Sequence, residues 1–133
     1  MKPIVVLALL LGLSSCFNES VGELVTRLKT RDSRELRQVT TELLLLDTEV
    51  IVPALRKGLH SDKWRTRYMS AELLGKLKAA EAVPDLVTAL NDTADGVIAS
   101  SAVALGEIGD STANEALVVL LTHANPDVAK RGA

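Results

Sequence analysis

Side chains able to ligate a metal or act as a general base are scarce in this 133-residue chain, which has two histidines. Neither His60 nor His123 has a histidine or glutamate three or four residues further on, the spacing that places two ligands on one helix face. The sequence has no glycine-rich phosphate loop and no serine in a nucleophile-elbow context. We therefore expect solvated histidines near helix ends, no metal, no cofactor and no enzymatic activity.

The single cysteine, Cys16, suggests covalent chemistry of another kind. It follows an uncharged apolar run from Pro3 to Leu13, which is too short to span a bilayer but has the length of the apolar part of a secretory signal. The tetrapeptide LSSC that ends at Cys16 resembles the lipobox of bacterial lipoproteins. The resemblance implies a signal peptide over residues 1–15 and lipidation of Cys16. The alternatives are an ordinary signal peptide or a buried N-terminal helix with an incidental cysteine.

A lipidated cysteine would place the chain in a bacterial cell envelope, anchored on the periplasmic side. Phe17 follows the cysteine where an aspartate would be the inner-membrane retention signal, so by resemblance the outer membrane is favoured. Ser20 and Glu23 match a capping box and predict that the first helix begins at Ser20. Residues 17–19 would then form a spacer of about 10–14 Å, which keeps the domain close to the membrane.

The strongest candidates for binding a partner are Trp64 and Tyr68, two of the three aromatic residues of the chain. They are four residues apart and so share one helix face, with Arg65 beside them. Trp, Tyr and Arg dominate binding hot spots. Glu72 and Lys76 continue this face and complete the predicted partner-binding surface. The alternative is that the aromatic rings fill the groove between two neighbouring sequence repeats, the first over residues 19–49 and the second over residues 50–81.

The charges are unevenly distributed along the chain. Residues 27–78 contain twelve basic and seven acidic residues, whereas residues 79–129 contain eight acidic residues and no lysine or arginine. The net charge of −2 gives no indication of nucleic-acid binding. The basic half would face anionic lipid beside the anchor, and the acidic half a basic partner or a second copy. The alternative is sequence drift on two solvated surfaces.

Repeated helical hairpins must position these residues. The motif Val-Pro-x-Leu at 52–55 recurs at 83–86, and Leu-Gly at 74–75 recurs at 105–106, a period of 31 residues. Such a period indicates stacked repeats. Apolar residues at i, i+3, i+4 and i+7 predict helices. The predicted fold is an all-α, right-handed α-solenoid of about three and a half hairpins over residues 16–133, with repeats at 19–49, 50–81, 82–112 and an incomplete 113–133.

These motifs, with Ala-x-x-Leu-Gly-x-Ile-Gly-Asp over 102–110, resemble the HEAT-like repeat of the phycobilisome lyase family. The resemblance covers essentially the whole chain after Cys16. It implies a polar ladder in which an inter-helix aspartate accompanies an arginine early in the second helix. Asp32 with Arg37 and Asp62 with Arg67 fit this pattern, and Ile98 ends it. One branch of HEAT-like proteins binds iron through His-Glu pairs, and this sequence has no His-Glu dipeptide.

Together these features predict a lipid-anchored, non-enzymatic interaction module or scaffold. Its partner would be a protein that the sequence does not identify, or a second copy bound through the incomplete C-terminal repeat. Two alternatives stay open. One is an accessory subunit for attaching a chromophore or cofactor, as the family resemblance implies. The other is a truncated fragment without function.

Overall fold

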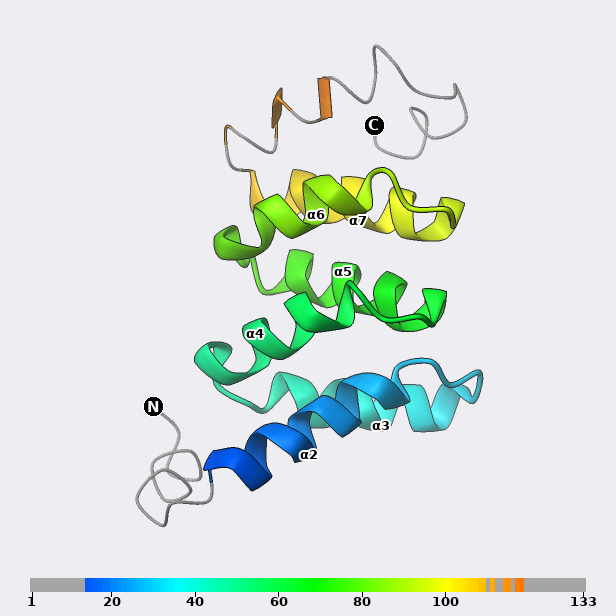
Figure 1. The fold of residues 1–133 in the computed structure, drawn as a ribbon, viewed down its shortest axis with the longest axis vertical. Coiled ribbons are helices and arrows are strands. Elements are labelled where there is room, and N and C mark those ends of the chain that lie inside the picture. The colour runs from blue at the N-terminus through cyan, green and yellow to red at the C-terminus, as the bar shows by residue number, and fades with distance from the viewer. Residues whose placement is uncertain (1–13, 110, 112–113, 116, 119–133) are drawn as a thin grey trace.

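The chain folds into helical hairpins stacked one on another (Figure 1). The computed structural model describes residues 14–109, 111, 114–115 and 117–118. This part contains helices and no strands, and none of its helices is both long and apolar enough to cross a membrane. The elements are α2 (Ser14–Arg27), α3 (Ser33–Leu44), α4 (Thr48–Gly58), α5 (Trp64–Lys76), the short 3-10 helix η1 (Ala80–Ala82), α6 (Val83–Ala89) and α7 (Asp95–Ile108).

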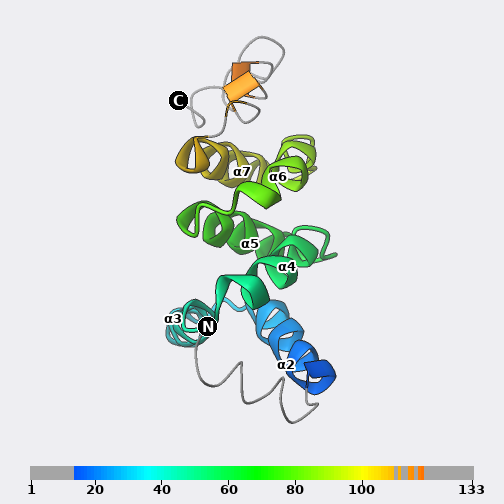
Figure 2. The same ribbon diagram turned by 90° about the vertical axis from the view of Figure 1, so that its left-hand side faces the viewer.

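The helices form two layers. The first helices of the hairpins, α2, α4 and α6, lie on one side of the stack, and α3, α5 and α7 lie on the other (Figure 2). The second helices begin at Ser33, Trp64 and Asp95, each 31 residues after the one before. This spacing confirms the predicted period and the all-α solenoid. The predicted signal peptide over 1–15 falls almost wholly outside the described residues, as do most of the predicted fourth repeat and His123.

The core is aliphatic, as the composition predicts. Leucine and valine side chains from both layers meet between the hairpins, and each buried leucine contributes about 2–3 kcal/mol of transfer free energy. Equivalent positions recur at the 31-residue period, so Leu43, Leu74 and Leu105 are each fully buried in their second helix. The other large side chains with less than 2% exposure include Leu28, Ile51, Leu55, Leu73 and Leu86.

Gly75 allows α5 and α7 to pack closely. A Cβ atom built at Gly75 would lie 2.7 Å from the Cα atom of Ala104 and would also meet the Glu107 carboxylate. Glycine inside a helix costs about 1 kcal/mol relative to alanine, and this close approach offsets that cost. Gly106, one period later, has no neighbouring atom within 4 Å in the described part.

The first hairpin packs differently, and Leu44 explains the difference. Leu44 occupies the position of Gly75 one period earlier, so α3 presents a bulky side chain where α5 presents bare backbone. The main packing partner of α3 is α2, whereas α5 packs on α7, α4 and α2 (Figure 2). Leu44 and the following Leu45 remain 42% and 64% exposed. The joint between the first two hairpins is therefore looser than the joint between the second and third.

The first helix begins earlier than the capping-box motif predicts. α2 begins at Ser14, so Ser20 is an interior helical residue and not an N-cap. Residues 17–19 are therefore helical, and at 1.5 Å per residue they extend only about 4–5 Å. α4 begins at Thr48, which places Pro53 inside the helix, whereas Pro84 lies at the start of α6. In α4 the buried residues Ile51, Val52 and Leu55 lie on both sides of Pro53, and their packing carries the helix through the proline.

Candidate protein-interaction surface

The two aromatic rings lie at the start of α5, beside the third hairpin. A Cβ atom built at Gly96 of α7 would lie 3.7 Å from Cδ2 of Tyr68 and 3.8 Å from Cζ3 of Trp64. Both rings therefore pass over the bare backbone of Gly96. Trp64 is 46% exposed and Tyr68 is half-buried. Both rings therefore lie against the third hairpin, whereas the alternative interpretation places them between the first and the second.

Arg65 lies over the face of the Trp64 ring. Its Cζ atom is 4.9 Å from the ring centroid, a cation–π contact worth about 0.5–1 kcal/mol at an exposed site. The contact buries Nε of Arg65, which has no hydrogen-bond partner among the described residues. The guanidinium makes no ion pair in this part of the chain, so its terminal nitrogens are free to donate to a binding partner.

Glu72 and Lys76 complete the surface. Lys76 Nζ donates to Glu72 Oε1 at 2.6 Å across one helical turn. Such exposed pairs contribute about 0.3–0.5 kcal/mol, so the pair mainly neutralises this end of the helix. Four-residue steps place Trp64, Tyr68, Glu72 and Lys76 on one slowly winding stripe. We refer to these four residues with Arg65 as the α5 stripe. It is aromatic and cationic at its N-terminal end and charge-neutral at its C-terminal end.

Arg67 joins the second hairpin to the third. Its Nε and Nη2 atoms donate to the two carboxylate oxygens of Asp92 at 2.7 and 2.9 Å, and its Nη1 donates to the Ser61 carbonyl at 2.8 Å. Asp92 also accepts from the Ala94 backbone N–H. The two side chains are only 15% and 11% exposed. This bidentate, largely buried geometry is the strong form of an arginine–carboxylate pair.

The residues of the predicted ladder, Asp32 with Arg37 and Asp62 with Arg67, form no ion pair with each other among the described residues. Asp62 pairs with the adjacent Lys63, and Asp32 caps α3 by accepting backbone N–H groups. Arg67 is the fourth residue of α5, whereas Arg37 is the fifth residue of α3. One residue turns a helix by about 100°, so Arg37 points to solvent and is exposed. The rung found in the described residues runs from one hairpin to the next.

The Arg67–Asp92 pair predicts a specific loss of stability in acid. Hydrogen bonds from Arg67 hold the pKa of Asp92 below its ordinary value of 3.8, with help from the Ala94 backbone N–H and against the effect of burial. The unfolded chain therefore takes up the proton first. The contribution of the pair is fully present above about pH 5 and is lost as the pH falls through 3.8 towards the folded pKa.

Urea unfolding of the full chain from pH 7 to pH 2.5 measures this loss. Asp92→Asn should be less stable than wild type at pH 7, and the difference should shrink steadily below pH 4. Glu35→Gln is the matched control: hydrogen bonds from Thr30 and Arg27 lower the pKa of Glu35, but this carboxylate is exposed and contributes little. A difference between Asp92→Asn and wild type that does not change with pH would contradict the assignment.

Some of the basic and acidic residues that the sequence segregates form ion pairs with each other between neighbouring hairpins. Arg56 Nε lies 2.5 Å from Asp85 Oδ2, and His60 Nε2 lies 3.4 Å from Asp85 Oδ1. The basic second hairpin therefore bonds to the acidic third through both layers. Four other basic residues are exposed near the turn between α2 and α3: Lys29, Arg31, Arg34 and Arg37.

The described residues do not fit the iron site known in one branch of HEAT-like proteins. The only described histidine, His60, is engaged with Asp85, and no group of three His, Cys, Asp or Glu side chains in this part of the chain could hold a metal ion. His123 lies outside the described residues.

Three residues that shape the surface and its support escape prediction from the sequence: Asp85, Asp92 and Gly96. Each acts across the boundary between two hairpins, whereas the sequence motifs compare positions within one hairpin. A signal was present in the charges. Residues 79–129 have no lysine or arginine, so an ion pair of their eight carboxylates with such a residue must reach outside this segment, to an earlier hairpin or to Lys130 and Arg131.

The stacked helical hairpins, the polar rung between them and the exposed second-helix face define an α-solenoid of the repeat class. The family described as HEAT repeats matches residues 21–104. The chain therefore belongs to the HEAT-repeat family.

Two similar proteins show how widely this unit is used. The chain is 29% identical over 128 residues to the eIF-2-alpha kinase activator GCN1 of Dictyostelium discoideum, covering 85% of this chain and 5% of that protein. The structure of human deoxyhypusine hydroxylase in complex with glycerol is similar with a TM-score of 0.67 and 27% identity, over 84% of this chain and 40% of that one. The chain thus spans well under half the length of either relative. HEAT-repeat proteins commonly act by binding other proteins, and the second relative is named as an enzyme.

Proposed function

We propose that this chain is a membrane-anchored HEAT-repeat scaffold that holds a protein partner on the α5 stripe and has no catalytic activity of its own. Stacked repeats present one extended surface, which suits binding to a macromolecule. The name of the GCN1 relative describes an activator of a kinase, a protein that acts on another protein. The scarcity of histidine and cysteine in the full sequence also favours binding over catalysis.

The observation that carries the proposal is the half-exposed Trp64 with Arg65 stacked on it. Burying a large aromatic ring at an interface contributes strongly to affinity, and Trp and Arg are enriched at hot spots. The ring is held by Arg65 on its face and by Gly96 beneath it. It therefore loses little conformational freedom on binding, which lowers the entropic cost of association.

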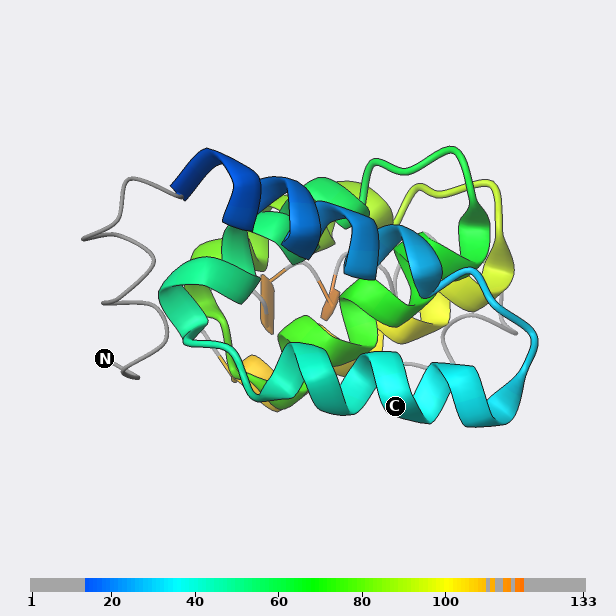
Figure 3. The same cartoon turned by 90° about the horizontal axis from the view of Figure 1, so that it is seen from below.

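The anchor in this proposal is a lipid on Cys16, on the periplasmic side of a bacterial outer membrane. Its support is the lipobox-like tetrapeptide in the sequence. Helices α2 and α3 form one end of the stack, seen face-on from below (Figure 3). The exposed cations near the turn between α2 and α3 belong to this end, so they would meet anionic headgroups, each adding about 1 kcal/mol near the surface.

Trp64→Ala tests the proposal directly. We expect this variant of the full-length chain to bind its partner about 30-fold more weakly, the size of a hot-spot loss, with the melting temperature nearly unchanged because the side chain is half exposed. The partner is first recovered by affinity purification from the producing cells, and its affinity for each purified variant is then measured by titration. Glu81→Ala, an exposed change on the turn before α6, should bind as wild type.

Two outcomes would contradict the proposal. Undiminished binding by Trp64→Ala would remove the α5 stripe as the interface. Equal partitioning of wild type and Cys16→Ser into the aqueous phase after detergent phase separation would remove the anchor and leave the interface untouched.

A second candidate is an accessory subunit that helps an enzyme attach a chromophore or cofactor. The resemblance to the lyase-type repeat and the structural similarity to a hydroxylase support it. Absorption spectra of the purified chain distinguish the two, since a bound chromophore or cofactor belongs only to this second candidate.

A further inference from the structure

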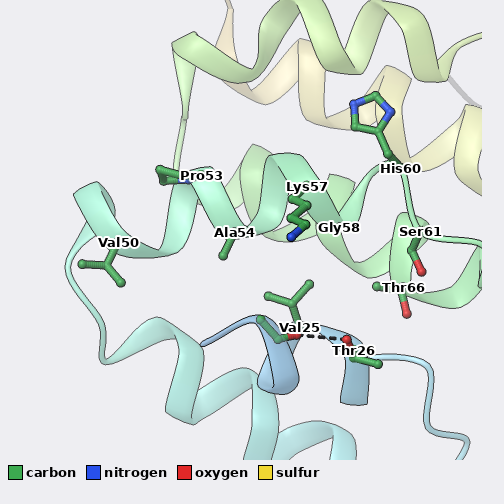
Figure 4. Close-up of a pocket in the computed structure, with 11 residues that line it drawn as sticks. Val25, Thr26, Val50, Pro53, Ala54, Lys57, Gly58, His60, Ser61 and Thr66 are labelled. Carbon is green, nitrogen blue, oxygen red and sulfur yellow. Dashed lines mark hydrogen bonds between the residues drawn. The ribbon is translucent and has the colours of Figure 1, made fainter. Parts of the chain in front are cut away.

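The first and second hairpins leave an open groove between α2 and α4 (Figure 4). Its volume is about 810 Å³, within the range of small-molecule sites. Val25 of α2 faces Ala54 and Lys57 of α4 across it, and Thr66 of α5 lies at one end. The groove lies mainly between the first helices, and Thr66 is not one of the five residues of the α5 stripe, so the two sites share no residue.

The 31-residue period explains why this groove is open. At the next joint the equivalent positions are Arg56 and Asp85, whose ion pair bridges α4 and α6. At this joint the same positions are Val25 and Ala54, which are too small and too apolar to bridge the helices. The cavity at the next joint, lined in part by Asp85, has a volume of only about 300 Å³. Because small aliphatic residues stand here in place of the ion pair, the space between α2 and α4 stays open and is lined there by apolar side chains.

The groove is apolar at one end and polar at the other. Val50, Pro53 and Ala54 line it along α4, and Lys57, Ser61 and Thr66 line the opposite end. From Val50 to Lys57 the helix extends about 10 Å, at 1.5 Å per residue. An occupant that fits this gradient has an aliphatic chain of moderate length and a single polar head.

Thr66 indicates that the head accepts a hydrogen bond. Its side chain is 2% exposed, and its hydroxyl has no hydrogen-bond partner in the described part of the chain. One period later the equivalent residue is Val97, which is fully buried, so packing at this position does not need a hydroxyl. A buried hydroxyl left without a partner is unfavourable, and an acceptor on a ligand would offset that cost.

Lys57 determines the charge of the head. It is exposed and makes no ion pair among the described residues, and the lining contains no acidic side chain. His60 also lines the groove, but its ring points towards Asp85 of the next hairpin. The free charge at the polar end is therefore positive. Extended peptides are poor occupants, because the flanking helices have no unpaired backbone edge along which a strand could bind.

We propose that this groove binds an aliphatic monocarboxylate. The chain lies against Val25, Val50 and Ala54, and the carboxylate accepts hydrogen bonds at the end formed by Lys57 and Thr66. Site and ligand both go beyond the proposed scaffold role and do not depend on it.

Isothermal titration calorimetry of the full-length chain with decanoate, below its micelle concentration, tests this site. Saturable binding of one decanoate per chain is expected, with decanol about tenfold weaker because it lacks the charge-assisted contact with Lys57. Decyltrimethylammonium, with the same chain and the opposite charge, should not bind. Equal binding of all three amphiphiles would reveal non-specific adsorption and would overturn the proposal.

Four variants locate the ligand. Lys57→Met should weaken decanoate binding but leave decanol unchanged, and Ala54→Phe should abolish both by filling the groove. Thr66→Val should weaken decanoate binding while keeping or raising the melting temperature, an outcome that a purely structural hydroxyl would not give. Lys78→Met, an exposed lysine outside both the groove and the α5 stripe, is the control and should bind as wild type. Wild-type affinity in Ala54→Phe, or a dimer that only this variant disrupts in sedimentation, would contradict the proposal.

Discussion

Gly75→Ala is expected to destabilise the protein by about 2 kcal/mol, although alanine is the better helix former. The new Cβ atom would lie 2.7 Å from the Cα atom of Ala104 and 2.9 Å from its Cβ atom. The carboxylate of Glu107 could swing away, but the Ala104 backbone moves only if α7 moves. Because α5 and α7 share the tightest joint of the stack, the two hairpins must separate to accept one methyl group. Thermal unfolding should show a fall in melting temperature of about 10 °C.

Gly106→Ala is the matched control, since Gly106 occupies the same repeat position. No described atom lies within 4 Å of a Cβ atom built there, so the variant should be neutral or more stable by up to about 1 kcal/mol. If both alanine variants gain stability, α5 and α7 do not approach as closely as the structure indicates. If both alanine variants lose stability, the two glycines share a role other than close packing.

Arg67→Ala is expected to cost about 3 kcal/mol, because it leaves the largely buried carboxylate of Asp92 without its counter-charge. Asp92→Ala should cost a similar amount for the converse reason. The double variant should cost less than the sum of the two, with a coupling energy of about 1–3 kcal/mol. Urea unfolding of the four proteins at pH 7 gives the complete cycle.

Arg37→Ala is the control for this cycle. Arg37 stands five residues after Asp32, as Arg67 stands five after Asp62, yet it is exposed and makes no ion pair among the described residues. Its removal should change stability by less than about 0.5 kcal/mol. A loss comparable to that of Arg67→Ala would restore the predicted pairing within hairpins. Additive effects of Arg67→Ala and Asp92→Ala would show that the two side chains do not act as a pair.

The helical layout was predictable because apolar spacing and stacking reinforce each other. Leu43, Leu74 and Leu105 recur at 31 residues and are each fully buried, so the period alone places the second helices. The glycine at position 75 was predictable as a point of close helix approach for the same reason. At the equivalent Gly106 no atom of the described residues lies within 4 Å of a Cβ atom built there, so the repeat position alone does not establish a close approach.

Contacts across hairpins were harder to predict. Spacing within a hairpin made Arg37 and Arg67 look equivalent, but the helix starts place Leu36, not Arg37, at the position of Arg67. The place of the Trp64 ring over Gly96 depends on how α5 is rotated against α7, which no local motif encodes. The open groove depends on the absence of an ion pair at one joint, and that becomes visible only when the two joints are compared.

Leu44 stands at the repeat position that Gly75 occupies in the second hairpin, and this difference has a mechanical consequence. With α5 and α7 in close contact, the second and third hairpins form a stiff block, whereas α3 packs mainly on α2 and forms a compliant joint with that block. If the chain is held at its N-terminal end while a partner pulls on α5, the load passes through this joint. The first hairpin then bends or rotates before the block deforms. Under such a load the first hairpin would change its angle, while the α5 stripe would keep its shape because the second and third hairpins hold it.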